Sequence, residues 1–245
     1  MFAEINLKSM KRVVFFAFAL LISHVALAQS DNKSFLSISA GPSLATGNFA
    51  LKDITSEDAG LAKTGIFADL AYGYKFSKHV GGMALLKGKT HGLDVTDFNL
   101  PLATDVTVDI ETGRWKSAAA MAGLFIHVPL DNAGALQLSV KGLAGAQYSA
   151  RPFVQITVTE RSEYNYSQGT SRQESVSGYG FSYLFGSDLK YSVNNKLALM
   201  LSLDYNSSNI KFEDSVRISG EGIVDVSSKN AISTLDLGLG VAFAF

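Results

Sequence analysis

The clearest pattern in the chain is the alternation of large apolar residues with small or polar ones over residues 232–245, ISTLDLGLGVAFAF. Successive side chains of a β-strand point to opposite faces, so residues two apart share a face. One face of this stretch carries leucine, valine and phenylalanine, and the other carries glycine, alanine, Thr234 and Asp236. The pattern predicts a strand with one apolar face, which ends on the aromatic Phe245.

The same alternation recurs in seven stretches upstream, each near or above the length that a tilted membrane strand needs. They are residues 34–43, 65–76, 79–88, 115–128, 135–148, 178–192 and 197–205. Two of these stretches leave a choice open. The two faces of 79–88 are hard to tell apart, and the alanines of 115–128 also suit a helix.

Long and short connections alternate between these eight stretches. The long ones are residues 45–64, 89–114, 149–176 and 212–230, and the short ones are 77–78, 129–134 and 194–195. An even strand number with short periplasmic turns and long extracellular loops is typical of bacterial outer-membrane barrels. The sequence therefore predicts an all-β fold, an eight-stranded antiparallel transmembrane up-and-down β-barrel with short periplasmic turns and four long extracellular loops.

In this topology the aromatic residues fall at two depths, as the two interfacial girdles of a membrane barrel do. The periplasmic rim would carry Tyr72, Tyr74, Phe76, Tyr191, Phe243 and Phe245, and the outer rim Tyr148, Tyr179, Phe181 and Tyr205. A soluble β-sandwich predicts no such sorting.

The long connections also contain alternating β-branched and polar residues, over 104–111, 153–159 and the pair 215–219 and 222–227. β-Branched residues favour strands, and the Ser-Gly-Glu-Gly sequence at 219–222 is a hairpin turn signal. We interpret these segments as barrel strands that continue beyond the membrane into protruding hairpins. Disordered loops are the alternative.

Residues 1–28 have the features of a secretory signal peptide. Lys11 and Arg12 precede an apolar run over 13–22, and Ala26-Leu27-Ala28 provides a cleavage site of small residues. We expect translation to start at Met10, cleavage after Ala28, and a barrel domain over residues 29–245. A short membrane anchor is the alternative, but the apolar run is too short to span a bilayer.

Composition narrows the classes of function. Charged residues make up 18% of the chain, below the usual quarter or so. The net charge of −1 leaves no basic field for nucleic acid. Because cysteine is absent, disulfides, thiol nucleophiles and cysteine-ligated metals are excluded.

The polar faces of the predicted strands would gather acids and bases inside the barrel. These residues are Asp69, Lys75, Lys87, Lys141, Asp188, Lys190, Asp204 and Asp236. An eight-stranded barrel is only wide enough for its side chains to fill, and an unpaired charge in a closed interior is costly. We expect a network of salt bridges and water that plugs the lumen, with a proton or ion path as the alternative.

Motifs for catalysis or metal binding are weak. Residues 82–90 resemble a phosphate-binding loop, but they contain one residue too many and lie on a predicted strand. His79, His91 and His127 are too dispersed to ligate one metal. No H-x-S stretch provides the histidine and serine that a site like that of lipid A deacylases would need. We therefore predict no catalytic residue, no cofactor and no metal site.

Acidic residues cluster in the second and fourth long loops. They are Asp94, Asp97, Asp105, Asp109 and Glu111 in one loop, and Glu213, Asp214, Glu221 and Asp225 in the other. We interpret them as a solvated surface, and divalent-cation bridging or a basic partner is the alternative.

The signal peptide, the eight alternating strands, the order of long and short loops and the terminal LGVAFAF resemble the OmpA/OmpX-type small outer-membrane barrel superfamily. More narrowly, the chain is similar to porin-family outer-membrane proteins whose whole mature chain is the barrel. The resemblance implies a bacterial outer-membrane location, contact with outer-membrane lipids and lipopolysaccharide, and insertion by machinery that reads the C-terminal strand.

Members of this superfamily include adhesins, complement-resistance proteins and many barrels without a known role, so the resemblance leaves several functions open. We hypothesise a structural or adhesion-like surface role without catalysis, with an extracellular ligand at loops two to four. A narrow passive pore for small solutes is the second hypothesis, and a lipid-modifying outer-membrane enzyme is the third.

Overall fold

Eight antiparallel strands close into a barrel in the computed structural model, which describes residues 33–53, 56, 58–96, 106–132, 134–161, 166–218 and 222–245. The ring order is β1-β11-β10-β9-β6-β5-β3-β2, and β2 pairs back onto β1. The strands are β1 (Ser34–Thr46), β2 (Ala62–Lys75), β3 (Val80–Leu93), β5 (Arg114–Pro129), β6 (Leu136–Ala150), β9 (Ser177–Ser192), β10 (Leu197–Ile218) and β11 (Gly222–Ala244). The predicted signal peptide lies outside the described residues.

All eight predicted strands are confirmed, and the two open choices are settled. The alanine-rich stretch is strand β5, which pairs along its length with β3 and β6, so the helical alternative is wrong. In β3, Met83 and Leu85 are buried inside the barrel, whereas the side chain of Leu86 is 58% exposed on the outside. Among the described residues, no helix is long and apolar enough to cross a membrane.

The outer face of the barrel is apolar, which is the inverse of a soluble protein. Leu239 on β11 is 72% exposed, and exposed leucine, isoleucine and valine side chains continue around the wall. The predicted girdle aromatics that are exposed outward are Tyr72, Tyr74, Phe76, Tyr191 and Phe243 at the end with the short turns, and Tyr179, Phe181 and Tyr205 toward the other end. A band of this kind matches the lipid-facing surface of an outer-membrane barrel.

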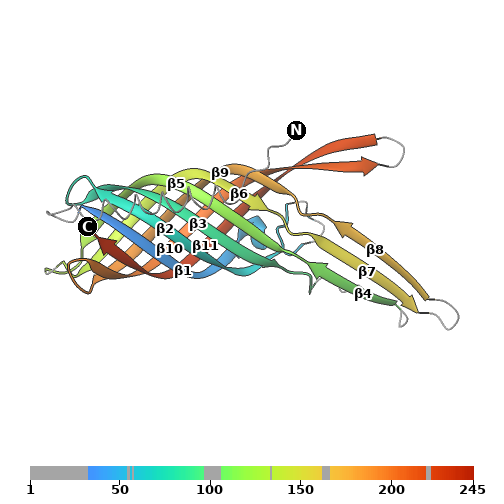
Figure 1. The fold of residues 1–245 in the computed structure, drawn as a ribbon, viewed down its shortest axis with the longest axis horizontal. Helices are drawn as coiled ribbons and strands as arrows, with labels where there is room; N and C mark the ends of the chain where they lie inside the picture. The colour runs from blue at the N-terminus through green and yellow to red at the C-terminus, as the bar shows by residue number, and fades with distance from the viewer. Residues whose placement is uncertain are drawn as a thin grey trace, which may run out of the picture.

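Several strands continue past the barrel at the end opposite the short turns (Figure 1). There, β4 (Val106–Thr112), β7 (Val154–Arg161) and β8 (Tyr166–Gln173) form a separate sheet in the order β4-β7-β8. Along the chain, β4 leads into β5, β6 leads into β7, and β8 leads into β9. The protruding sheet is therefore an extension of three adjacent barrel strands.

The prediction of protruding hairpins is confirmed in part and corrected in part. Strands β10 and β11 stay paired as far as Ile218 and Gly222, as predicted for the last loop. The segment predicted at 153–159 forms a hairpin, β7 with β8, whereas the segment at 104–111 does not, because β4 pairs with β7 across two loops. Strand β8, which pairs with the other side of β7, was not predicted.

The apolar outer wall gives a first testable prediction. Leu239→Arg places a charge on the lipid face, and we expect it to lower the free energy of unfolding by about 2–4 kcal/mol, as a cation near the bilayer midplane does. Urea unfolding of protein refolded into lipid vesicles measures this loss. Val158→Arg on the protruding sheet is the matched control, with an expected change within about 0.5 kcal/mol because that site faces water. Equal losses in the two variants would contradict a membrane-embedded wall.

Candidate functional site

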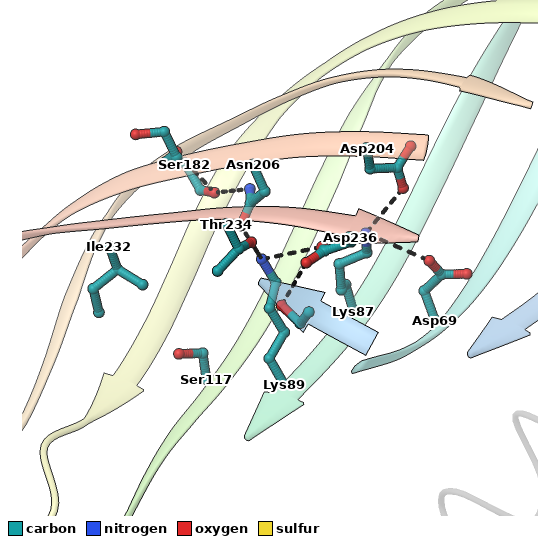
Figure 2. Close-up of polar contacts among 12 residues, drawn as sticks. Asp69, Lys87, Lys89, Ser117, Ser182, Asp204, Asn206, Ile232, Thr234 and Asp236 are labelled. Carbon is teal, nitrogen blue, oxygen red and sulfur yellow. Dashed lines mark hydrogen bonds and ion pairs between the residues drawn. The ribbon is translucent and has the colours of Figure 1, made fainter. Parts of the chain in front are cut away.

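The centre of the barrel interior is held together by Lys87, which projects inward from β3. Asp204 on β10 and Asp236 on β11 are directly opposite each other in the sheet, an arrangement in which like charges repel. The ammonium of Lys87 reaches across the lumen to both carboxylates, at 2.9 and 3.0 Å (Figure 2). Its cross-strand neighbour Asp69 is 3.6 Å away. One cation therefore joins carboxylates from three strands.

Two further lysines extend this network along the lumen. Lys141 on β6 contacts Asp188 at 2.7 Å and Asp204 at 3.0 Å. Lys89 lies 3.3 Å from Asp236, and its ammonium donates to Asn206 and Thr234 at 2.6 Å each. The charges are thus paired and hydrogen-bonded, which is the condition for keeping ions in a closed interior.

A glycine makes one of these ion pairs sterically possible. Gly186 on β9 lies in register between Lys141 on β6 and Asp204 on β10. A Cβ atom at this position would overlap the Asp204 carboxylate. Because Gly186 has no side chain, Lys141 can reach past its own neighbouring strand to Asp204.

Most residues predicted to point inward do so. Asp69, Lys87, Lys141, Asp188, Lys190, Asp204 and Asp236 are all buried, and Lys75 is half-buried at the end with the short turns. The prediction of a salt-bridge network is confirmed for the central group. The residue missed was Lys89, because the predicted strand ended at residue 88; the two-residue period from Lys87 would have found it.

Apolar side chains cluster in the mouth of the barrel at the end with the protruding strands. The short 3-10 helix η2 (Gly47–Ala50) places Phe49 in the mouth, where its ring packs edge-to-face on Trp115 at a centroid distance of 5.3 Å. The cluster around them contains Ala62, Ile210, Phe212 and Ile232. The indole of Trp115 also donates to the backbone oxygen of Gly60 at 3.0 Å, which fixes the first loop across the opening.

Ion pairs on the outside of the molecule also hold the first loop, residues 45–64. The Asp94 carboxylate lies 2.8 Å from the ammonium of Lys52 and 3.6 Å from that of Lys63, and it accepts a hydrogen bond from the Thr96 hydroxyl. The hydrogen bonds from Lys52 and then Thr96 hold the pKa of Asp94 well below its usual range. In the fourth loop, Glu213 pairs with Lys211 at 2.8 Å. Asp97, Asp105 and Glu221 lie outside the described residues.

The histidines are dispersed, as predicted, but two of them touch serines. His91 Nε2 lies 3.0 Å from Ser43 Oγ, which in turn donates to Asp236 at 2.5 Å. His127 Nδ1 lies 3.3 Å from Ser139 Oγ. Both contacts face the barrel interior, and the described residues contain no group of histidine and acidic side chains arranged to hold a metal. The phosphate-loop resemblance at 82–90 lies within strand β3.

The protruding sheet has two chemically different faces. Directly opposed residues in β4 and β7 share a face, and the pairs Val108–Val158 and Ile110–Ile156 are aliphatic. The alternate positions are polar, including Asp109 opposite Thr157. Val158 remains 40% exposed. The sheet therefore presents a strip of aliphatic side chains beyond the barrel, which we call the aliphatic strip (Val106, Val108, Ile110, Val154, Ile156 and Val158).

The family of the chain follows from comparison with known proteins. The family model described as the outer membrane protein beta-barrel domain matches residues 15–245. The chain belongs to this family. It is an eight-stranded barrel of the bacterial outer membrane, and, as in bacterial barrels generally, the short turns lie on the periplasmic side and the protruding strands outside.

Solved barrels of the outer membrane resemble the chain at low sequence identity. Ail, the attachment invasion locus protein of Yersinia pestis, is 14% identical with a TM-score of 0.43, covering 88% of this chain and 100% of that chain. OprG from Pseudomonas aeruginosa is 13% identical with a TM-score of 0.41, covering 87% and 96%. A major outer membrane protein from Thermus thermophilus is 13% identical with a TM-score of 0.40, covering 86% and 99%. A search of the curated proteins finds no match.

The central lysine provides a second prediction. Lys87→Met leaves Asp204 and Asp236 facing each other without the cation, and we expect a loss of about 3–5 kcal/mol in the free energy of unfolding, as when one partner of a buried pair is removed. Urea unfolding of the refolded protein measures it. Lys211→Met removes a lysine from an exposed pair and is the control, with an expected loss below about 1 kcal/mol. If the two losses were the same, the network would not hold the barrel together.

Proposed function

We propose that this outer-membrane barrel is a surface-interaction protein, whose barrel anchors the protruding sheet for contact with an extracellular macromolecule. The observation that carries the proposal is the aliphatic strip. A contiguous apolar surface outside the membrane is a feature of interaction sites, since it is better covered by a partner than by water.

The strand edges of the same sheet add a second means of contact. β4 and β8 are the outer strands in the order β4-β7-β8, so each has one row of backbone N–H and C=O groups without a sheet partner among the described strands. An extended segment of another protein can add to such an edge through main-chain hydrogen bonds. An aliphatic strip beside a free edge suits a partner in extended conformation with alternating apolar residues.

The remaining parts of the proposal concern processing and the membrane. We infer cleavage of a signal peptide after Ala28, a mature barrel over residues 29–245, and insertion guided by strand β11. The apolar outer wall would contact outer-membrane lipids and lipopolysaccharide. These inferences rest on the segment pattern of the N-terminus and on the exposed leucine and phenylalanine side chains of the wall.

A passive pore has less support than a surface role. The aliphatic and aromatic cluster at the mouth and the ion pairs of Lys87 and Lys141 occupy successive levels of the lumen. An eight-stranded barrel is too narrow to hold these side chains and a water column together. We expect refolded protein to give little or no single-channel conductance in a planar bilayer, and steady discrete openings would favour the pore instead.

A lipid-modifying enzyme is also less well supported. The described serine–histidine contacts, His91 with Ser43 and His127 with Ser139, point into the barrel and away from the lipid that such an enzyme would modify. An acyl-transfer or hydrolytic site on a lipid substrate needs its nucleophile on a lipid-accessible surface. Intact-mass analysis of lipid A from cells with and without the protein tests this function directly.

The surface role predicts that two neighbouring substitutions differ in effect. Ile156→Glu puts a charge into the aliphatic strip, whereas Thr157→Glu puts the same charge on the opposite, polar face of the same strand. We expect Ile156→Glu to reduce attachment and aggregation of cells that display the protein by about tenfold or more, the factor for 1.4 kcal/mol. Thr157→Glu should stay near the unmodified level.

A shortened variant controls for the barrel itself. Replacing residues 97–112 and 154–173 by short Gly-Ser turns removes the protruding sheet and leaves the barrel strands paired. Heat-modifiable migration on a denaturing gel shows whether each variant is folded. Attachment by the folded, shortened barrel at the level of the full chain would refute the proposed role of the sheet.

A further inference from the structure

The periplasmic end of the barrel contains a cavity that is independent of the surface sheet. It has a volume of about 210 Å³ and lies beneath the β9–β10 turn. Its lining combines polar and apolar side chains, and the polar ones are Lys75, His127, Gln137, Lys190, Ser192, Asn194, Asn195 and Lys196. None of its lining residues is an aspartate or glutamate. The cavity is therefore positively charged.

Lys190 is the residue that makes this cavity unusual. The residue is only 6% exposed, yet within the described residues its ammonium makes no hydrogen bond or close ion pair and is attracted only at longer range by the Asp188 carboxylate. Its one specific contact is the face of the Phe35 ring, whose centroid is 3.8 Å from the ammonium. A buried ammonium without a hydrogen-bonded anion is costly, so an anionic group in the cavity would complete its environment.

The nearest acid in sequence on the same face is already engaged. Asp188, two residues before Lys190 on β9, directs its carboxylate to Lys141 at 2.7 Å. The central network thus uses its own carboxylates and leaves Lys190 on the cavity side. Phe35 and Phe125 form the cavity floor, with their rings edge-to-face at a centroid distance of 5.6 Å. Behind them the apolar cluster with Met83, Leu85 and Leu143 fills the lumen.

The opposite side of the cavity is accessible from the periplasm. Asn194, Asn195 and Lys196 belong to the exposed turn between β9 and β10 and line its rim. The cavity is therefore a blind vestibule, with amide and ammonium groups at its rim, a buried ammonium inside and an aromatic floor. A small anion could enter from the periplasm without crossing the barrel.

We propose that this vestibule binds a phosphate-sized oxyanion from the periplasm, with Lys190 as its principal ligand and Lys75, His127 and Lys196 around it. Charge-assisted hydrogen bonds from ammonium groups to oxyanions are the strong class of such bonds. Such an oxyanion has two sources, free inorganic phosphate and the phosphodiester of a lipid headgroup. This site is at the opposite end of the molecule from the aliphatic strip and does not depend on the proposed surface role.

Titration of the full, refolded protein in neutral detergent tests the site. Inorganic phosphate is added at constant ionic strength and binding is followed by phosphorus NMR; a second titration uses glycerophosphoethanolamine, a soluble headgroup phosphodiester. We expect saturable binding of one ligand per chain, and an affinity about tenfold or more weaker in Lys190→Met. Lys78→Met is the matched control, since Lys78 is an exposed lysine at the same end that does not line the cavity.

The outcomes separate cleanly. Saturable binding of phosphate alone identifies free phosphate as the ligand, and saturable binding of the phosphodiester alone identifies a lipid headgroup. Either result supports the site if Lys190→Met weakens the binding and Lys78→Met does not. The absence of saturable binding, or equal weakening in both variants, overturns it.

A measurement on the unmodified protein decides the matter if Lys190→Met fails to fold. Lysine acetylation by acetic anhydride is followed by mass spectrometry with and without the bound anion. We expect the anion to slow acetylation of Lys190 several-fold and to leave the rate at Lys78 unchanged. Equal rates at Lys190 in both conditions contradict the proposal.

Discussion

The narrowness of an eight-stranded barrel determines most of this structure. Closing the sheet removes its edges, and it also encloses an interior with room only for side chains. Because alternate residues must point inward, every strand contributes to that filling. The lipid requires the other face to be apolar, so the charged residues of the central strand segments are placed in the lumen. The charged side chains gathered there must therefore form ion pairs with one another.

Lys87 shows how that requirement is met. Its cross-strand neighbour is Asp69, but its closest carboxylates come from the opposite wall, where Asp204 and Asp236 would repel each other without it. The network therefore connects strands that are far apart in the ring and not hydrogen-bonded to one another. The middle of the barrel is occupied by the contacts that hold its walls together, which leaves its two ends for the proposed surface and anion contacts.

The sequence predicted those parts of the molecule that depend on a period of two. The eight strands, the inward charges and the outer apolar band follow from alternation and from the lengths of the connections, because a membrane barrel allows few other solutions. Lys89 was missed because the predicted strand ended at residue 88, five residues before the end of β3 at Leu93. Predictions about strand ends are the weakest, because the loss of alternation there is gradual.

Two other features had no usable signal in the sequence. Strand β8 reads YSQGTSRQ, without an apolar face, and it is a strand only because β7 provides an edge for it. The pairing of β4 with β7 depends on β5 and β6 being neighbours in the ring, which brings the segments leading into and out of them side by side. Both are consequences of tertiary structure, which overrides local propensity in strands more readily than in helices.

The position of Lys190 follows from the balance of charge inside the barrel. Asp69, Asp188, Asp204 and Asp236 are in ion-pair contact with Lys87, Lys89 and Lys141, so the central group already has a cation beside each carboxylate. Lys190 and Lys75 are additional positive charges placed toward the periplasm. A purely structural role at Lys190 would be served as well by an uncharged side chain of similar length packed on Phe35, without the cost of burying an ammonium. A cation retained at the floor of an open vestibule is better explained by an anion that enters it.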